Sequence, residues 1–200
     1  MEPVQVTASA LSGIDIAKIV LASGVVAAVI GWIKDYLFKS RDRARDAKFN
    51  AISVIAKLDL YSLQSRQKIR DYHELTAQLV PERDYQNWPR CTYPELEITT
   101  DELRLLDSKN ASVLTWLNTE KMLASEYLYG VYESSFDPTD VHSHKADIVG
   151  YFGYEAFLLA EALRKKHRLP AFGQRWGVDD DFSDLCSSWE DTKKAVAKQK

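Results

Sequence analysis

The feature that most constrains this chain is an uncharged, apolar segment near its N-terminus, Ile19–Ile33. Lys18 and Lys34 close the segment at both ends. As a helix it would be about 22 Å long, whereas the hydrocarbon core of a bilayer is about 30 Å thick. A membrane-spanning helix must therefore include flanking apolar residues, and the sequence predicts a transmembrane helix over 14–38. Both lysines would then reach the interfaces along their apolar stems.

Other interpretations of this segment are open. A cleaved signal peptide needs a small-residue cleavage site after the apolar stretch, and residues 31–36 offer none. A core helix of a soluble protein is the stronger alternative, because short apolar runs are often core helices. A helix lying in the plane of the membrane is disfavoured, since the segment is apolar on all sides.

Basic residues are distributed unevenly around the segment, which predicts its orientation. Only Lys18 precedes it, whereas six basic residues lie between positions 34 and 48: Lys34, Lys39, Arg41, Arg43, Arg45 and Lys48. The positive-inside rule counts lysine and arginine. We therefore expect residues 1–13 to form a disordered extracytoplasmic tail and the chain after Lys34 to lie in the cytoplasm, with the lipid bilayer as a partner.

The sequence after the anchor predicts helices and no convincing strands. Apolar residues recur at helical spacing through 40–79, with Pro81 just beyond. This stripe predicts a core face first and a partner-binding face second. It consists of Ala44, Ala51, Ile55, Leu58, Ile69, Tyr72 and Leu79.

Two further long helices follow, over about 99–132, with a possible break near Asp107–Asn110, and over about 139–168, and a short helix is expected from about Phe182. Thr99 and Glu102 have the spacing of a capping box at the start of the first of these. The predicted fold class is all-α: an N-terminal transmembrane helix followed by an antiparallel bundle of three long helices plus a short C-terminal helix. The predicted parts are the tail (1–13), the transmembrane helix (14–38), the bundle (39–170) and the C-terminal segment (171–200).

One cluster has metal-ligand character: Asp140, His142, His144 and Asp147. On a helix, His142 and His144 diverge by about 200°, so they cannot both bind one ion, although His144 and Asp147 can share a face. A zinc site needs three or four convergent ligands, and no second cluster is visible in the sequence. We expect no bound metal and no cofactor, and keep these four residues as weak candidates.

Catalytic motifs are missing from the sequence, including the phosphate-binding loop, the nucleophile elbow and the zincin helix. Cys91 follows the cation Arg90, which could lower the pKa of the thiol, but no partner histidine is identifiable. The net charge of −3 and the pI near 5.8 argue against nucleic-acid binding. Aromatic residues at helical spacing over 127–157 predict core rather than a ligand pocket. The chain is therefore predicted not to be an enzyme.

The apolar segment also carries small residues at helical spacing: Ser23, Ala27 and Gly31, with Gly24 and Ala28 in parallel. Small residues at this spacing let two membrane helices approach closely. They predict self-association or packing on a partner membrane protein.

The layout resembles small bacterial single-pass membrane proteins of unknown function with a cytoplasmic helical domain. The resemblance rests on residues 31–36 (Gly-Trp-Ile-Lys-Asp-Tyr), which run into the basic helix, and on residues 161–170 (Glu-Ala-Leu-Arg-Lys-Lys-His-Arg-Leu-Pro). It implies a bacterial inner-membrane location and no activity. Our hypothesis is a membrane-anchored helical protein that acts through protein–protein contacts or self-association. The alternatives are a membrane-perturbing effector and a metal-binding or enzymatic helical domain.

Overall fold

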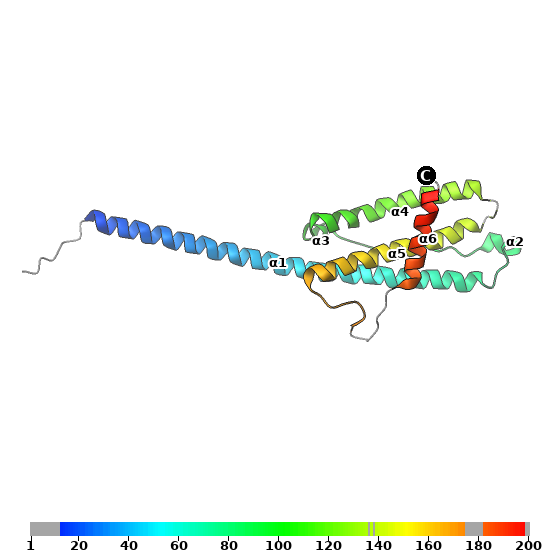
Figure 1. The fold of residues 1–200 in the computed structure, drawn as a ribbon, viewed down its shortest axis with the longest axis horizontal. Coiled ribbons are helices and arrows are strands. Elements are labelled where there is room, and N and C mark those ends of the chain that lie inside the picture. The colour runs from blue at the N-terminus through cyan, green and yellow to red at the C-terminus, as the bar shows by residue number, and fades with distance from the viewer. Residues whose placement is uncertain (1–12, 136, 138, 175–181, 199–200) are drawn as a thin grey trace, which may run out of the picture. The chain divides into compact units, whose positions relative to one another are not determined.

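The computed structural model describes residues 13–135, 137, 139–174 and 182–198, and every regular element in these ranges is a helix (Figure 1). The predicted all-α fold class is therefore confirmed. The elements are α1 (Gly13–Thr76), α2 (Pro81–Asp84), the 3₁₀ helix η1 (Tyr85–Asn87), α3 (Thr100–Arg104), α4 (Ser108–Ser134), α5 (Asp140–His167) and α6 (Ser183–Lys198).

The first helix, α1, runs without a break through the predicted boundary at residue 38. No glycine or proline lies between Gly31 and the end of α1, so nothing in the sequence interrupts it. The chain divides into two compact units, residues 1–46 and 47–200. In the first unit, the described side chains from Ala27 to Asp46 are exposed.

The structure bears on the predicted anchor only in part. Residues 1–12 and the side chains of 13–23, 25 and 26 lie outside the described residues, and these include most of the predicted tail and half of the predicted span. Across the part of the chain that is described, no helix has a stretch long and apolar enough to cross a membrane.

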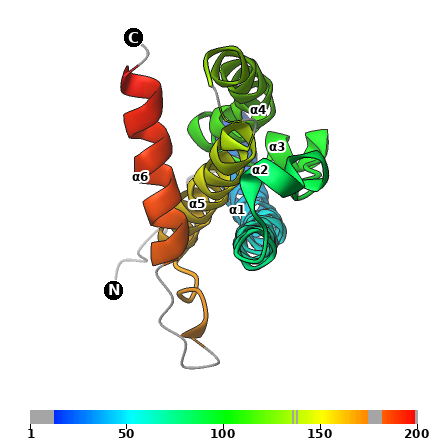
Figure 2. The ribbon, with the colours of Figure 1, turned by 90° about the vertical axis from the view of Figure 1, so that its right-hand side faces the viewer.

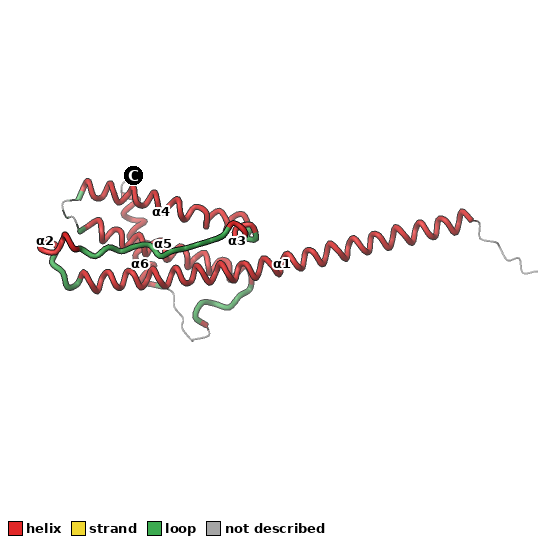
Figure 3. Tube along the Cα trace, turned by 180° about the vertical axis from the view of Figure 1, so that it is seen from behind, coloured by secondary structure: helices red, strands yellow, loops and turns green. Residues whose placement is uncertain are grey.

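The second unit is a helical bundle made of residues 47–76 of α1 together with α4, α5 and α6. The loop over 88–99 runs back along the length of the bundle to α3 (Figure 3). As a result, α1 and α4 run in the same direction, and α5 runs antiparallel to both (Figures 1 and 3). The expected antiparallel order thus holds for α5 but not between α1 and α4. The last helix, α6, packs across α5 (Figure 2).

The core lies between α1, α4 and α5, with apolar residues from each helix fully or nearly fully buried. Of the residues predicted to form a core face over 40–79, Ala51, Ile55, Leu58 and Tyr72 are buried, so the prediction is confirmed for these four. Ala44 is exposed, and Leu79 lies beyond the end of α1 at Thr76. The other core residues include Val54, Tyr61, Leu114, Leu117, Leu128, Ile148, Phe152, Leu159 and Leu163.

Two glycines on α5 allow its neighbours to approach closely. A Cβ at Gly153 would lie 2.6 Å from the Cβ of Ser65 on α1, and a Cβ at Gly150 would lie 2.5 Å from the Cβ of Ser188 on α6. The Ser62 hydroxyl on α1 donates a 2.9 Å hydrogen bond to the carbonyl oxygen of Gly153. Small residues on all three helices therefore set how closely they pack.

Aromatic side chains hold the 88–99 segment on the bundle. The Tyr93 ring meets Phe152 of α5 edge to face, with 5.7 Å between centroids. The indole nitrogen of Trp88 donates a 3.3 Å hydrogen bond to the Tyr72 hydroxyl on α1. Large rings at these contacts bury apolar area and attach a segment without regular structure to the bundle.

The predicted capping box at Thr99 is confirmed. The Thr99 hydroxyl accepts from the backbone N–H of Glu102, and the Glu102 carboxylate accepts from the backbone N–H of Thr99 at 2.8 Å. Glu102 also joins α3 to α1, because its carboxylate accepts hydrogen bonds from Lys57 at 2.8 Å and from the Ser53 hydroxyl at 2.9 Å. One carboxylate thus caps α3 and fixes it to α1.

A buried arginine links α5 to α1. Arg164 is 6% exposed, and its guanidinium pairs with Asp59 of α1 and, at 3.1 Å, with Glu161 of α5. Burial raises the pKa of Asp59, although the hydrogen bond and charge of Arg164 act in the opposite direction. A buried cation of this kind requires its carboxylate partners, so the pair specifies the register between the two helices.

The glycine contact generates the first prediction. Gly153→Ala should lower the free energy of unfolding by about 1–3 kcal/mol, because the added methyl group overlaps Ser65. Gly130→Ala is the matched control, since its Cβ would meet nothing within 4 Å. The control should raise stability by about 0.5–1 kcal/mol through helix propensity alone. Denaturant unfolding of the full chain in detergent measures both; equal effects of the two variants would contradict the close approach.

Glu102 generates the second prediction. Burial alone would raise the pKa of Glu102, but the hydrogen bonds that Lys57, Thr99 and Ser53 donate to its carboxylate lower this pKa to about 2. A carboxyl whose pKa falls on folding adds stability above its unfolded pKa, and this stability is lost as the pH drops toward the folded pKa. Glu102→Gln should cost about 1 kcal/mol at neutral pH. Its unfolding free energy should also fall less than that of the wild type between about pH 5 and pH 2. Parallel pH profiles would contradict this role.

Candidate functional site

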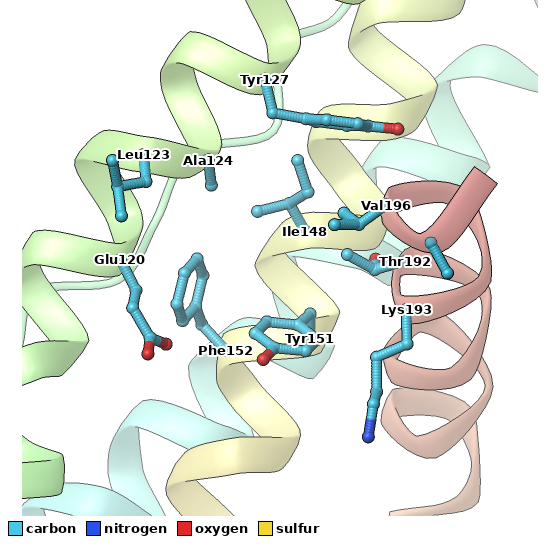
Figure 4. A pocket seen from close by; sticks show the side chains of 11 residues that line it. Glu120, Leu123, Ala124, Tyr127, Ile148, Tyr151, Phe152, Thr192, Lys193 and Val196 are labelled. Carbon is cyan, nitrogen blue, oxygen red and sulfur yellow. The ribbon is translucent and has the colours of Figure 1, made fainter. Parts of the chain in front are cut away.

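Two cavities lie along α4: one of about 470 Å³ bordered by α5 and α6, and one of about 350 Å³ bordered by α5 and α1. Both have Glu120 of α4 and Tyr151 of α5 in their lining. Figure 4 shows the larger cavity, with Leu123 and Tyr127 on the α4 side and Val196 on the α6 side. We call this surface the α4 groove: Val113, Trp116, Glu120, Leu123 and Tyr127 of α4, Tyr151, Phe152 and Glu155 of α5, and Thr192, Lys193 and Val196 of α6.

Carboxylates give the α4 groove its charge. Glu120 extends from α4 toward Tyr151 and Phe152 (Figure 4). Partial burial raises the pKa of Glu120, and the charge of Glu155 raises it further. Glu155 accepts a 2.6 Å hydrogen bond from the indole nitrogen of Trp189 on α6. Among the described residues, no cation pairs with Glu120, so its charge is available to a ligand.

A second apolar surface lies on α1, on the side facing away from the core. Its residues follow a spacing of three or four, and at about 100° per residue they fall within an arc of about 80°. The exposed fractions are 64% for Phe49, 43% for Ile52, 54% for Leu60 and 42% for Leu63, and Ala56 is also exposed. We call these five residues the α1 stripe.

The four metal candidates are only partly brought together. His144 and Asp147 line a cavity of about 100 Å³ with Asp191 of α6, as their shared helix face predicts. His142 is not among the residues that line it, and its pKa is lowered by burial and then by the charge of Arg90. Asp140 accepts a 2.6 Å hydrogen bond from the Ser135 hydroxyl. Within the described ranges, no three His, Cys, Asp or Glu side chains are arranged to hold a metal ion.

A pair of lysines faces the tyrosines of the core. The Lys145 ammonium lies 3.3 Å from the centroid of the Tyr93 ring, and the Lys121 ammonium lies 4.6 Å from that of Tyr61. Burial lowers the pKa of Lys145 to about 8. Both contacts are cation–π interactions: Lys145 fastens the 88–99 segment to α5, and Lys121 joins α4 to α1, which gives both lysines a structural role.

The predicted membrane-packing residues lie in the first unit. Gly24, Ala27, Ala28 and Gly31 are exposed, and the side chain of Ser23 lies outside the described residues. A Cβ at Gly24 or Gly31 would meet nothing within 4 Å in a single copy of the chain. Their packing on another membrane helix therefore stays a prediction.

Sequence reasoning missed both apolar surfaces, although their spacing is visible. Phe49, Ile52, Ala56, Leu60 and Leu63 repeat at three and four on a helix whose other face is the predicted core face. In the aromatic series, Phe152 is core as expected, but Tyr129 and Tyr132 are 64% and 63% exposed. For these two residues the prediction of core is wrong, because both lie near the end of α4 on faces that no other described helix covers.

The thiols generate the third prediction. Cys91 is 4% exposed, and burial raises its pKa to about 11 despite the nearby charges of Lys68 and Lys145. This environment is the opposite of that of a nucleophilic cysteine. At mildly alkaline pH a thiol reagent should modify the half-buried Cys186 first and reach Cys91 only on unfolding. Peptide mass spectrometry measures the order; equal rates at both residues in the native protein would contradict it.

The described residues offer two candidate binding surfaces. Along the described chain, the α4 groove has an apolar lining with a central carboxylate, and the α1 stripe is apolar throughout. Comparison of the chain with protein-family models, with curated proteins and with solved structures finds no match.

Proposed function

We propose that this chain is a membrane-tethered, non-catalytic interaction protein whose copies associate through α1. The tether is the segment 14–38, with the N-terminus outside and the helical bundle in the cytoplasm. Support for the tether comes from the sequence alone, from Ile19–Ile33 and the basic residues that follow it. Its resemblance to bacterial single-pass proteins favours the inner membrane as its location.

The observation that carries this proposal is the α1 stripe. The buried residues of α1, such as Val54, Leu58 and Tyr61, lie on the opposite side of the helix. Phe49, Ile52, Leu60 and Leu63 therefore form a second apolar face that stays exposed in the described part of the bundle. Exposed apolar patches of this kind on an otherwise polar surface mark interaction sites.

A second copy of the chain is the occupant that this surface fits. Two copies anchored in one membrane with the same orientation present α1 in the same direction. Identical stripes can then face each other across a two-fold axis, as an isologous interface requires. The steps of three, four, four and three residues keep the stripe on one side of the helix, close to the alternating steps of a coiled-coil seam. Small residues at Ala27 and Gly31 support close approach of the same helix within the lipid.

The membrane-perturbing alternative predicts the same oligomer but a different effect on the cell. In that case association of the anchors would permeabilise the bilayer, and Gly31→Leu would abolish growth arrest on expression. Normal growth on strong expression separates the interaction protein from the effector. For the metal-binding or enzymatic alternative, His144, Asp147 and Asp191 line one cavity, but within the described ranges no three such side chains are arranged to hold a metal ion.

Crosslinking in membranes provides the fourth prediction. Leu60→Cys, in a chain with Cys186→Ser, should form disulfide-linked dimers on oxidation, since identical stripes place both copies of residue 60 at the interface. Ser125→Cys on an exposed part of α4 is the matched control and should give about tenfold less dimer, because it lies outside the seam. Leu60→Glu together with Leu63→Glu should leave the fold intact, because both side chains are exposed.

The double variant should also run as a monomer in crosslinking with an amine-reactive reagent. Equal dimer yields from Leu60→Cys and Ser125→Cys would contradict association through the α1 stripe.

A further inference from the structure

Like α1, the helix α4 has a second apolar face outside the core. Unlike the α1 stripe, this face borders residues of the neighbouring helices. Val113, Trp116, Glu120, Leu123 and Tyr127 are spaced by three and four residues and fall within an arc of about 80°. Trp116 and Leu123 are each 57% exposed, and Val113 is 41% exposed. The adjacent face of α4, which includes Leu114, Leu117 and Leu128, packs in the core. The exposed face is thus left over after the bundle has formed.

The dimensions of the α4 groove suit a helix. From Val113 to Tyr127 it follows α4 for about 21 Å, or about four turns. The lining comes from α4 on one side and from α5 on the other, with α6 added only at the larger cavity, and both cavities have Glu120 and Tyr151 in their lining. Helices that bind in grooves place apolar residues at positions i, i+3, i+4 and i+7, which matches this length and spacing.

The negative charge of the α4 groove favours partner helices that carry a basic side chain. Glu120 occupies the middle of the exposed face of α4, and Glu155 lines the same cavity from α5. Within the described chain neither Glu120 nor Glu155 has a cationic partner, while Lys193 at the far rim is held 3.8 Å from the Trp189 ring. A basic side chain that reached this point would meet two carboxylates in a partly apolar setting, where ion pairs are stronger than in water.

We propose that the α4 groove binds an amphipathic helix of a partner protein, with apolar side chains against Trp116, Leu123 and Tyr127 and a central lysine or arginine between Glu120 and Glu155. The site is on a different helix from the α1 stripe, so it stands independently of self-association. Its apolar part supplies affinity, and its carboxylates supply specificity and orientation.

Peptide binding to the full chain in lipid nanodiscs tests the proposal. The probe is a labelled helical peptide of about 15 residues with leucines at the heptad a and d positions and one central lysine. A second peptide carries glutamate in place of that lysine. Fluorescence anisotropy should show the lysine peptide binding about tenfold more tightly than the glutamate peptide, and Glu120→Lys should reverse the order. Glu126→Lys, the same charge change away from the groove, should leave the order unchanged.

The apolar half of the groove is tested with neighbouring residues. Leu123→Asp should weaken binding of the lysine peptide at least tenfold, whereas Met122→Asp should not, because Met122 is 73% exposed and lies outside the groove. Circular dichroism of both variants checks that the fold is retained. The proposal would be overturned if the two peptides bound equally or if the two aspartate variants had equal effects. It would also be overturned if the peptides bound nanodiscs without the protein as tightly as nanodiscs that contain it. The proposal would also be overturned if the chain formed concentration-dependent dimers that only Leu123→Asp abolished. The occupant of the α4 groove would then be a second copy of the chain.

Discussion

The close approach of α5 to its neighbours is the constraint on which the rest of the bundle depends. Because Gly150 and Gly153 have no side chain, Ser188 of α6 and Ser65 of α1 reach the α5 backbone from two sides. This contact holds α6 across α5 instead of along α4 (Figures 1 and 2). A helix that crosses its neighbour covers only a short part of it, so the outer face of α4 remains open. The α4 groove is therefore a consequence of how α5 packs.

The helices and the antiparallel direction of α5 could be predicted from the sequence, but the direction of α4 relative to α1 could not (Figures 1 and 3). Repeats at three and four mark each long helix, and the Thr99–Glu102 capping box marks a start correctly. The error concerns the connection over 88–99, because the sequence predicts that it joins antiparallel neighbours. Twelve extended residues span up to about 40 Å, which is also about the length of a 27-residue helix such as α4. Pro89 and Pro94 keep the segment out of helix, so it crosses the whole bundle and makes α1 and α4 parallel.

Less of the candidate site than of the fold could be predicted from the sequence, for a different physical reason. Helical geometry alone separates His142 from His144, so the weakness of the metal cluster follows from the spacing of its residues. The α4 groove, in contrast, needs Glu120, Glu155 and Lys193 from three helices, and no local pattern reports that they meet. The same holds for which face is buried: α1 and α4 each carry two apolar faces, and periodicity does not distinguish the packed face from the open one.

Two open apolar faces on one small bundle call for a reason, since burying one large aliphatic side chain is worth about 1.5–3 kcal/mol. The α1 stripe belongs to the helix that continues into the proposed anchor, where two copies are confined to one plane and already share a direction. Confinement raises their effective concentration, so a short apolar seam can be sufficient there. A partner that reached the α4 groove from solution would not have that advantage. A partner from solution must be selected by more than apolar area, and a central carboxylate pair provides such selection at the middle of the groove.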